Sequence, residues 1–118
     1  VSDDNFCIFY HNCGANTPGM TESLSANGAV AYHFGDAINL EDVLIKMPSD
    51  KPVLGNISPT KQFLNGTPES IYRATTELLE RCAKYPNFVL SSGCDIPPRA
   101  PWENIDAFFC AASDFYNK

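Results

Sequence analysis

The sequence has few basic residues, and they are not clustered. Lys and Arg together number 8 against 14 Asp and Glu in 118 residues, which gives a formal net charge of −6. A nucleic-acid-binding surface requires clustered positive charge, so we exclude nucleic acid as a partner. No apolar run is long enough to cross a bilayer and no signal peptide is recognisable, so we expect no membrane partner either.

Paired cysteines of the Cys-x-x-Cys kind are absent, although the chain has 5 cysteines. Structural zinc sites usually take four ligands from such pairs, so that kind of site is excluded. An odd number of cysteines without a signal peptide also argues against a disulfide framework. We therefore expect a cytoplasmic protein with reduced thiols.

Apolar residues make up 44% of the chain, enough for the core of one domain over residues 1–118. Four short runs are rich in β-branched or aromatic residues and close on Gly, Asn or Pro. They are Phe6–Tyr10, Val30–Phe34, Val53–Ile57, and Phe88–Leu90 with the serines after it. Their continuous apolar character predicts strands buried on both faces, as in a parallel sheet.

Helical patterns separate these runs. The clearest has Thr67 as a cap, Pro68 at the first helical position and an apolar stripe that ends at Cys82. A last helix begins at the letters APWEN, with a stripe of Ile105, Phe108, Phe109, Ala112 and Phe115, and shorter helices are predicted over 20–26 and 40–46. The alternation predicts an α/β fold of four parallel βα units, which is either a small open sheet or half of a (β/α)8 barrel.

Chemistry-bearing residues follow the first and fourth predicted strands. His11 and Cys13 come after the first, and Cys94 follows the fourth on a turn at Gly93. In parallel α/β folds the carboxyl ends of the strands carry the functional site. One histidine and two cysteines suit zinc, and three protein ligands leave a position open, as in catalytic sites. The alternative is that these cysteines only fill space, the interpretation we adopt for Cys7, Cys82 and Cys110.

Three stretches of the sequence resemble the uroporphyrinogen decarboxylase superfamily. They read YHNCGA, GNISPTKQFLNGTPE and FVLSSGCDIPPRAPWENIDAF, and together they resemble the C-terminal half of that family's (β/α)8 barrel. One branch of the family has no metal, whereas the zinc methyltransferases carry a His-x-Cys motif and a later Cys. His11-Asn12-Cys13 and Cys94 place this chain closest to the methyltransferases of the methylcobalamin:coenzyme M type. The resemblance implies Zn²⁺ held by His11, Cys13 and Cys94, a corrinoid carried by a partner protein, and a small thiol as methyl acceptor.

Four further strand-end residues are candidates for the site. His33 and Asp36 follow the second strand and are expected to orient a ligand or contact substrate, or else to make local hydrogen bonds and cap a turn. Asn56 and Ser58 follow the third strand and are expected to contact the cofactor or to shape the loop.

Two other functions stay open at the level of sequence. Uroporphyrinogen decarboxylation, a step of porphyrin biosynthesis, needs a pocket of arginines for many carboxylates, and the chain has only Arg73, Arg81 and Arg99. The other alternative is an inactive truncated domain. Because half a barrel leaves open strand edges, we expect the partner to be a missing N-terminal half or a second copy of the chain.

Overall fold

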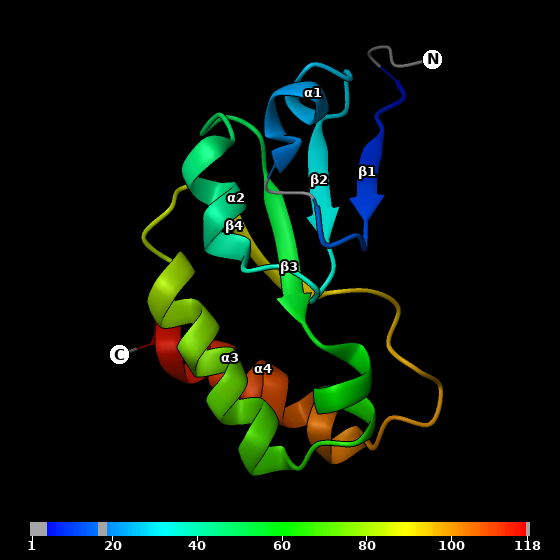
Figure 1. Ribbon diagram of the computed structural model, residues 1–118. Helices are drawn as coiled ribbons and strands as arrows, with labels where there is room; N and C mark the ends of the chain where they lie inside the picture. The colour runs from blue at the N-terminus through cyan, green and yellow to red at the C-terminus, as the bar shows by residue number, and fades with distance from the viewer. Residues whose placement is uncertain (1–4, 17–18, 118) are drawn as a thin grey trace.

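The computed structural model describes residues 5–16 and 19–117 and shows a four-stranded parallel sheet with helices between the strands (Figure 1). The elements are β1 (Phe9–Asn12), α1 (Thr21–Ser25), β2 (Ala31–Phe34), α2 (Leu40–Lys46), β3 (Val53–Ile57), the π-helix η2 (Pro59–Leu64), α3 (Pro68–Cys82), β4 (Phe88–Ser92) and α4 (Trp102–Tyr116). The predicted fold class, a parallel α/β array that corresponds to the C-terminal half of a (β/α)8 barrel, is confirmed.

The strands follow one another in the sheet in the order of the chain, β1-β2-β3-β4. His11 of β1 pairs with His33 of β2, and Ile57 of β3 pairs with Ser92 of β4. Because all the pairings are parallel, the loops after β1, β2, β3 and β4 all leave the sheet at the carboxyl ends of the strands (Figure 1). The candidate site residues lie at these strand ends.

The first strand differs from its prediction in position and in burial. β1 begins at Phe9 rather than at Phe6, and it includes His11 and Asn12. Phe6 and Phe9 are 55% and 61% exposed, so this strand is not buried on both faces. The reason is that the side chains of β1 alternate between the two faces of the sheet: Phe9 and His11 are exposed on one face, whereas Tyr10 is half-buried against the core on the other.

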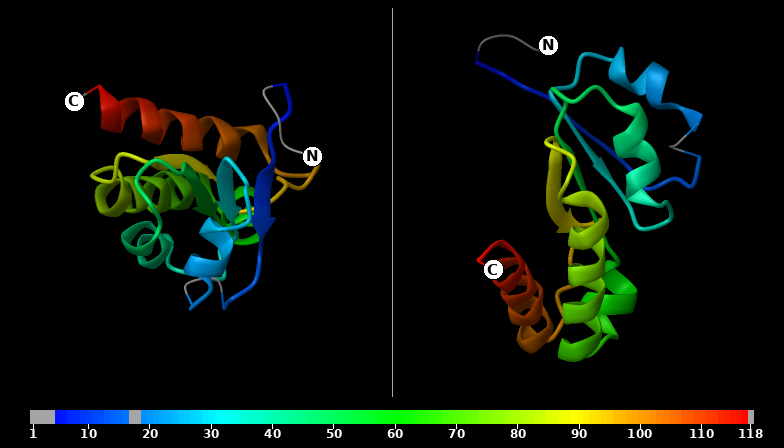
Figure 2. Two further views of the ribbon diagram at one scale, coloured as in Figure 1. Left: turned by 90° about the horizontal axis from the view of Figure 1, so that it is seen from above. Right: turned by 90° about the vertical axis from the view of Figure 1, so that its left-hand side faces the viewer.

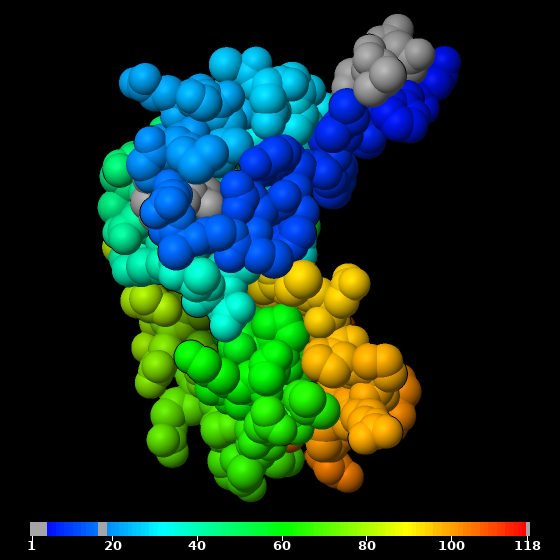
Figure 3. Space-filling view, turned by 45° about the vertical axis from the view of Figure 1, so that its right-hand side comes forward, coloured from blue at the N-terminus to red at the C-terminus, as the bar shows by residue number. Residues whose placement is uncertain are grey.

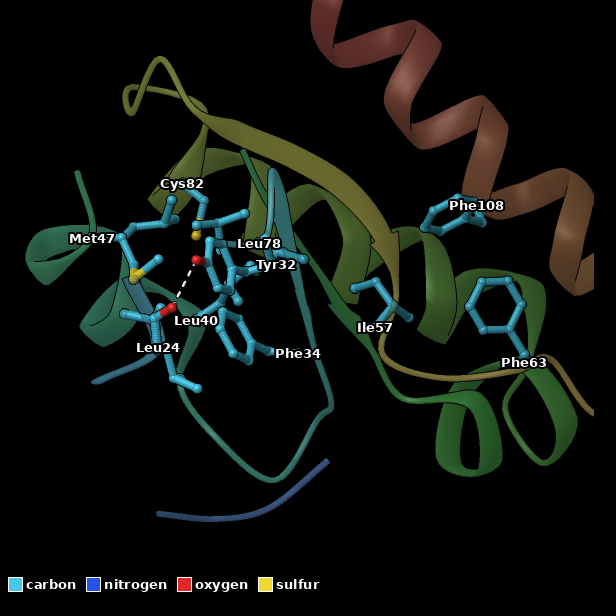
Figure 4. Packing of buried hydrophobic residues seen from close by; sticks show 14 of the residues in the cluster. Leu24, Tyr32, Phe34, Leu40, Met47, Ile57, Phe63, Leu78, Cys82 and Phe108 are labelled. Carbon is cyan, nitrogen blue, oxygen red and sulfur yellow. Dashed lines mark hydrogen bonds between the residues drawn. The ribbon is translucent and has the colours of Figure 1, made fainter. Parts of the chain in front are cut away.

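The core lies between the sheet and α1, α2 and α3 (Figures 2 and 4). Tyr32 of β2 is fully buried, and its hydroxyl donates a hydrogen bond of 2.7 Å to the carbonyl of Leu24 in α1. Leu40, Leu78 and Cys82 pack around this ring from α2 and α3. Burial of these side chains provides the main driving force for folding, since each contributes about 1.5–3 kcal/mol.

The α3 helix begins as its sequence predicts. The Thr67 side chain accepts from the Ser70 backbone N–H, and the Ser70 hydroxyl accepts from the Thr67 N–H, which forms a capping box. The residues predicted to form its apolar stripe are buried at Ile71, Leu78 and Cys82.

The π-helix η2 was not predicted, and a buried side chain of α4 holds its end. Asn104 is 1% exposed, and its amide donates to the carbonyl oxygens of Gln62, Phe63 and Gly66 at 3.3, 3.0 and 2.9 Å. The rings of Phe63 and Phe108 lie 5.1 Å apart, which packs α4 on the same segment (Figure 4). The right-hand view of Figure 2 shows α3 and α4 running side by side.

The predicted apolar stripe of α4 is correct for Phe108 and wrong for Phe109. Phe108 is buried, whereas Phe109 is 64% exposed, together with Trp102 at 76% and Tyr116 at 61%. These three exposed aromatic residues are seven positions apart and share a second face of the helix. One helix therefore has two apolar faces, and periodicity alone does not tell which of them is covered.

Among the described residues, no helix is long and apolar enough to cross a membrane.

Candidate metal centre

The structure brings together the three residues that the sequence singles out as zinc ligands. One ligand atom each from His11, Cys13 and Cys94 lies within 4.8 Å of the others. His11 projects from β1 itself rather than from the loop after it, so that detail of the prediction is corrected. Cys13 lies just beyond β1, and Cys94 lies two residues beyond β4. Figure 3 shows the blue residues at the end of β1 next to the yellow residues that follow β4.

Two glycines explain how loops from opposite edges of the sheet can meet. A Cβ atom on Gly35, in the loop after β2, would lie 3.1 Å from Cys13 Cα and 3.4 Å from its sulfur. A Cβ atom on Gly93 would lie 2.9 Å from the Asp36 nitrogen. The backbone after β2 is therefore in close contact with Cys13 on one side and with Gly93 on the other. The contact at Gly93 leaves no room for a side chain, whereas a Cβ atom at Gly35 would require Cys13 to shift by a few tenths of an ångström.

The hydrogen bonds of His11 fix which of its ring nitrogens carries the proton. Nδ1 lies 3.1 Å from the backbone carbonyl oxygen of His33, which can only accept, so Nδ1 is the donor. In the neutral ring Nε2 is then unprotonated, and it lies 2.8 Å from Cys13 Sγ. The Cys13 thiol donates to Nε2, so a proton lies between two atoms that could both bind a metal. A cation placed there would replace that proton.

The electrostatic surroundings of Cys13 keep its thiol protonated when no cation is bound. Reduced contact with water raises the pKa of the Cys13 thiol, although the residue is exposed overall, and a hydrogen bond with Cys94 raises that pKa further. The negative charges of Cys94, Asp36 and Asp95 act in the same direction. The same arrangement of like charges favours a divalent cation, because the cation compensates all of them.

His33 lies beside the three candidate ligands His11, Cys13 and Cys94, which we call the trio, and its own ring donates a hydrogen bond to the end of β4. Its ring centroid is 4.6 Å from that of His11, and its Nε2–H donates to the Ser92 carbonyl at 2.7 Å. That partner lies 59 positions away in the sequence, so the alternative of a local hydrogen bond is wrong for His33. Asp36 is exposed in the loop after β2.

Asn56 and Ser58 make hydrogen bonds that shape the strand-end loops. The Asn56 amide donates to the carbonyls of Gly35 and Ile38 at 3.0 and 2.9 Å, which attaches the loop after β2 to the end of β3. Ser58 caps η2 and accepts from the Lys61 N–H. Both border a hollow of about 270 Å³ that Asp36 also lines. Their contribution to cofactor binding stays a prediction.

The other three cysteines divide between core and surface. Cys82 is buried, as predicted, and burial raises the pKa of its thiol to about 11. Cys7 and Cys110 are exposed, so the prediction that they are packing residues is wrong. Cys7 precedes the edge strand β1, and Cys110 borders an open groove of about 880 Å³ between α3 and α4. That groove contains none of the predicted zinc ligands.

Sequence reasoning missed the residues that hold the candidate ligands in place. Gly35 and Ser92 make contacts between segments far apart in the chain, which no spacing rule detects. The turn at Gly93 was predicted, but its close contact with the loop after β2 was not. The one signal of these contacts in the sequence was the glycine turns at the strand ends, because glycine allows two backbones to approach closely.

The donor atoms decide what the trio can do chemically. One imidazole nitrogen and two thiols are soft ligands that suit zinc. His11 and Cys13 are exposed and Cys94 is half-buried, so a substrate can approach the trio from solvent. Three ligands with an accessible side are typical of a catalytic zinc site rather than a structural one.

Comparisons with known proteins agree with this architecture. The sequence profile of the uroporphyrinogen decarboxylase (URO-D) family matches residues 2–115. A methyltransferase from Methanosarcina mazei has a similar structure, with a TM-score of 0.79 and 24% sequence identity over 95% of this chain and 32% of that chain. This chain therefore spans about a third of the length of that protein. A search of curated protein sequences gives no match.

Proposed function

This chain belongs to the uroporphyrinogen decarboxylase family, and on that premise we propose that it is the zinc-binding part of a methyltransferase that moves a methyl group from a methyl-corrinoid to a thiol. The observation that carries the proposal is the convergence of His11, Cys13 and Cys94 within 4.8 Å at the strand ends. The structural likeness to a methyltransferase supports the fold on which the proposal depends. The thiols need a reducing compartment, so we place the protein in the cytoplasm.

The donor set fits zinc in number and in kind. Zinc bound there would supply the positive charge that keeps a substrate thiol deprotonated, and the methyl-corrinoid of a partner protein would supply the methyl group. His11 would bind through Nε2, because its Nδ1–H is held by the His33 carbonyl. Cys13 and Cys94 would bind as thiolates, and the proton that Cys13 shares with His11 would leave.

The chain's other groups set the charge and the order of the site. Asp36 and Asp95 add negative charge near Cys13. That charge favours a divalent cation and disfavours an anionic substrate without one. Asn56 holds the loop that carries Asp36, so we give it a supporting role in the site.

Uroporphyrinogen decarboxylation is the alternative that the family allows, and the small number of arginines and the charges around Cys13 argue against it. Arg73 lies on the exposed side of α3 and lines the groove between α3 and α4. Arg81, near the end of α3, borders the strand-end hollow that Asp36 and Asn56 also line, and the exposed Arg99 follows β4. Two arginines are few for a pocket that binds many carboxylates. The carboxylates of Asp36 and Asp95 add negative charge near Cys13, which would repel a polycarboxylate substrate.

Ligand binding by calorimetry distinguishes the two functions. Zinc-loaded and zinc-free samples of the chain are each titrated with a small thiol, such as coenzyme M, and with uroporphyrinogen. We expect the thiol to bind the zinc-loaded chain only, with release of about one proton. Binding of uroporphyrinogen to both samples, without thiol binding to either, would overturn the proposal.

A further inference from the structure

We propose that His33 is a positioning residue that ties the two arms of the candidate metal centre together. One arm is the segment of β1 that carries His11 and Cys13, and the other is the loop after β4 that carries Cys94. This inference rests on the proposed function and assigns to His33 the task of keeping the two arms at ligand distance, with or without a metal.

His33 contacts the first arm through its backbone and its ring. Its carbonyl oxygen accepts from His11 Nδ1 at 3.1 Å, which sets both the tautomer and the direction of the His11 ring. The two rings lie 4.6 Å apart with their planes tilted by 37°. A ring at position 33 therefore limits the rotation of the His11 side chain.

His33 contacts the second arm through its side chain. Its Nε2–H donates to the Ser92 carbonyl at 2.7 Å, and the Ser92 hydroxyl donates to the Cys94 carbonyl at 2.8 Å. These two bonds connect the imidazole to the backbone of a predicted zinc ligand. The His33 ring can donate to the Ser92 carbonyl because its Nε2 carries a proton, and the His33 backbone carbonyl separately accepts from His11.

The order of the strands gives this side chain its role. Main-chain hydrogen bonds join only neighbouring strands, and β3 lies between β2 and β4. The His33 side chain reaches past β3 to the end of β4, so it links arms that the sheet itself does not join. The loop after β4 has an independent anchor, since the Gly93 N–H donates to the Ile57 carbonyl at 2.8 Å. Loss of the His33 bond should therefore loosen the position of Cys94 without unfolding the loop.

Substitutions at position 33 separate the donor from the ring. His33→Gln keeps an N–H donor at a similar reach, His33→Phe keeps a ring without a donor, and His33→Ala removes both. Zinc dissociation constants are measured by chelator competition for all of them. Substitution of a residue that holds a metal ligand typically weakens metal binding about 10–100-fold. We expect a loss of that size in His33→Phe and His33→Ala, and a loss of less than about threefold in His33→Gln. Zinc binding by His33→Phe as tight as in the unaltered chain would overturn the inference.

A second measurement needs no metal, so it separates this inference from the proposed function. The zinc-free chain carrying Cys7→Ser and Cys110→Ser is equilibrated with glutathione redox buffers. Oxidised glutathione takes two electrons and two protons from Cys13 and Cys94, whose sulfur atoms join, and becomes two glutathione thiols. The equilibrium constant measures how closely the two thiols are held.

We expect this constant to fall about tenfold in His33→Ala and His33→Phe and to be restored in His33→Gln, since held groups react at a higher effective concentration. Equal constants in all of these chains would overturn the role of His33, whatever their zinc affinity. If the unaltered chain binds no zinc but the constants differ as expected, the proposed function fails and the role of His33 stands.

Discussion

Gly93, in the loop after β4, packs so closely against the loop after β2 that a Cβ atom at its position would lie 2.9 Å from the backbone nitrogen of Asp36. A backbone atom cannot move aside as a flexible side chain would, so one of the loops must shift when this space is filled. The loop that shifts carries either Cys94 or the Gly35 contact with Cys13. The candidate metal centre thus depends on the absence of a side chain as much as on the ligands.

Gly93→Ala is therefore expected to weaken zinc binding by about tenfold or more, with a stability loss of about 1–3 kcal/mol from overpacking. Gly35→Ala should have a smaller effect, because its Cβ atom would lie 3.1 Å from Cys13 Cα. Chelator competition and denaturant melts measure the two effects. Gly19→Ala is the matched control, because a Cβ atom at Gly19 would meet nothing within 4 Å. If Gly19→Ala lost as much zinc affinity as Gly93→Ala, the close contact would not be the cause.

Cys82 is expected to be the unreactive thiol of the chain. Burial raises the pKa of its thiol to about 11 from an ordinary value of 9.0, so almost no thiolate forms at pH 8. Alkylation of the native chain at pH 8 should modify the exposed Cys7 and Cys110 and leave Cys82 intact until denaturant is added. Rapid native labelling of Cys82 would contradict its burial.

The same shift predicts a change of stability with pH. In the unfolded chain Cys82 loses its proton near its ordinary pKa of 9.0, whereas in the folded chain it holds the proton until about 11. The stability that the buried thiol contributes is therefore complete below about pH 9 and declines as the pH rises toward 11. Cys82→Ala should show a shallower decline between these values in urea melts, and an identical slope would be inconsistent with the shift.

Asn104 is expected to be the most sensitive polar residue of the core. Asn104→Ala removes the side-chain amide that donates to the carbonyls of Phe63 and Gly66, and more weakly to that of Gln62, which should cost about 3 kcal/mol of unfolding free energy. Asn117→Ala is the control, since Asn117 is exposed and its side-chain amide donates to the Ser113 hydroxyl, and it should cost less than about 0.5 kcal/mol. Similar losses in the two variants would contradict the conclusion that the Asn104 amide stabilises the end of η2.

How much of this could be predicted from the sequence depends on the range of each interaction. The capping box at Thr67 and the stripe that ends at Cys82 are local, so α3 was predicted correctly. The candidate ligands His11, Cys13 and Cys94 could be grouped because the carboxyl ends of parallel strands lie on the same side of the sheet. The His33–Ser92 hydrogen bond, the η2 segment and the exposure of Phe109 could not be predicted, because each depends on segments that meet only in the folded chain.

The open strand edges predict that the isolated chain associates. Phe9 on β1 and Val89 on β4 are 61% and 42% exposed, and within residues 5–16 and 19–117 no strand pairs with the outer side of either strand. Unpaired apolar edges favour pairing with a second copy or with a missing N-terminal half. Light scattering should show a species larger than the monomer, and Phe9→Asp should shift that species toward monomer.

Ile45→Asp is the control: Ile45 lies on α2 and is 64% exposed, so its substitution should leave the association unchanged. A monomer that stays stable across dilution would rule the association out.

The most direct test of the account is the zinc content of the purified chain and its variants after equilibrium dialysis. We predict about one zinc per chain in the unaltered protein and in Cys110→Ala, whose cysteine is exposed and lies outside the trio. His11→Ala, Cys13→Ala and Cys94→Ala should each lose most of it, because each removes one of the atoms that lie within 4.8 Å of one another. Unchanged zinc content in both Cys13→Ala and Cys94→Ala would contradict the assignment.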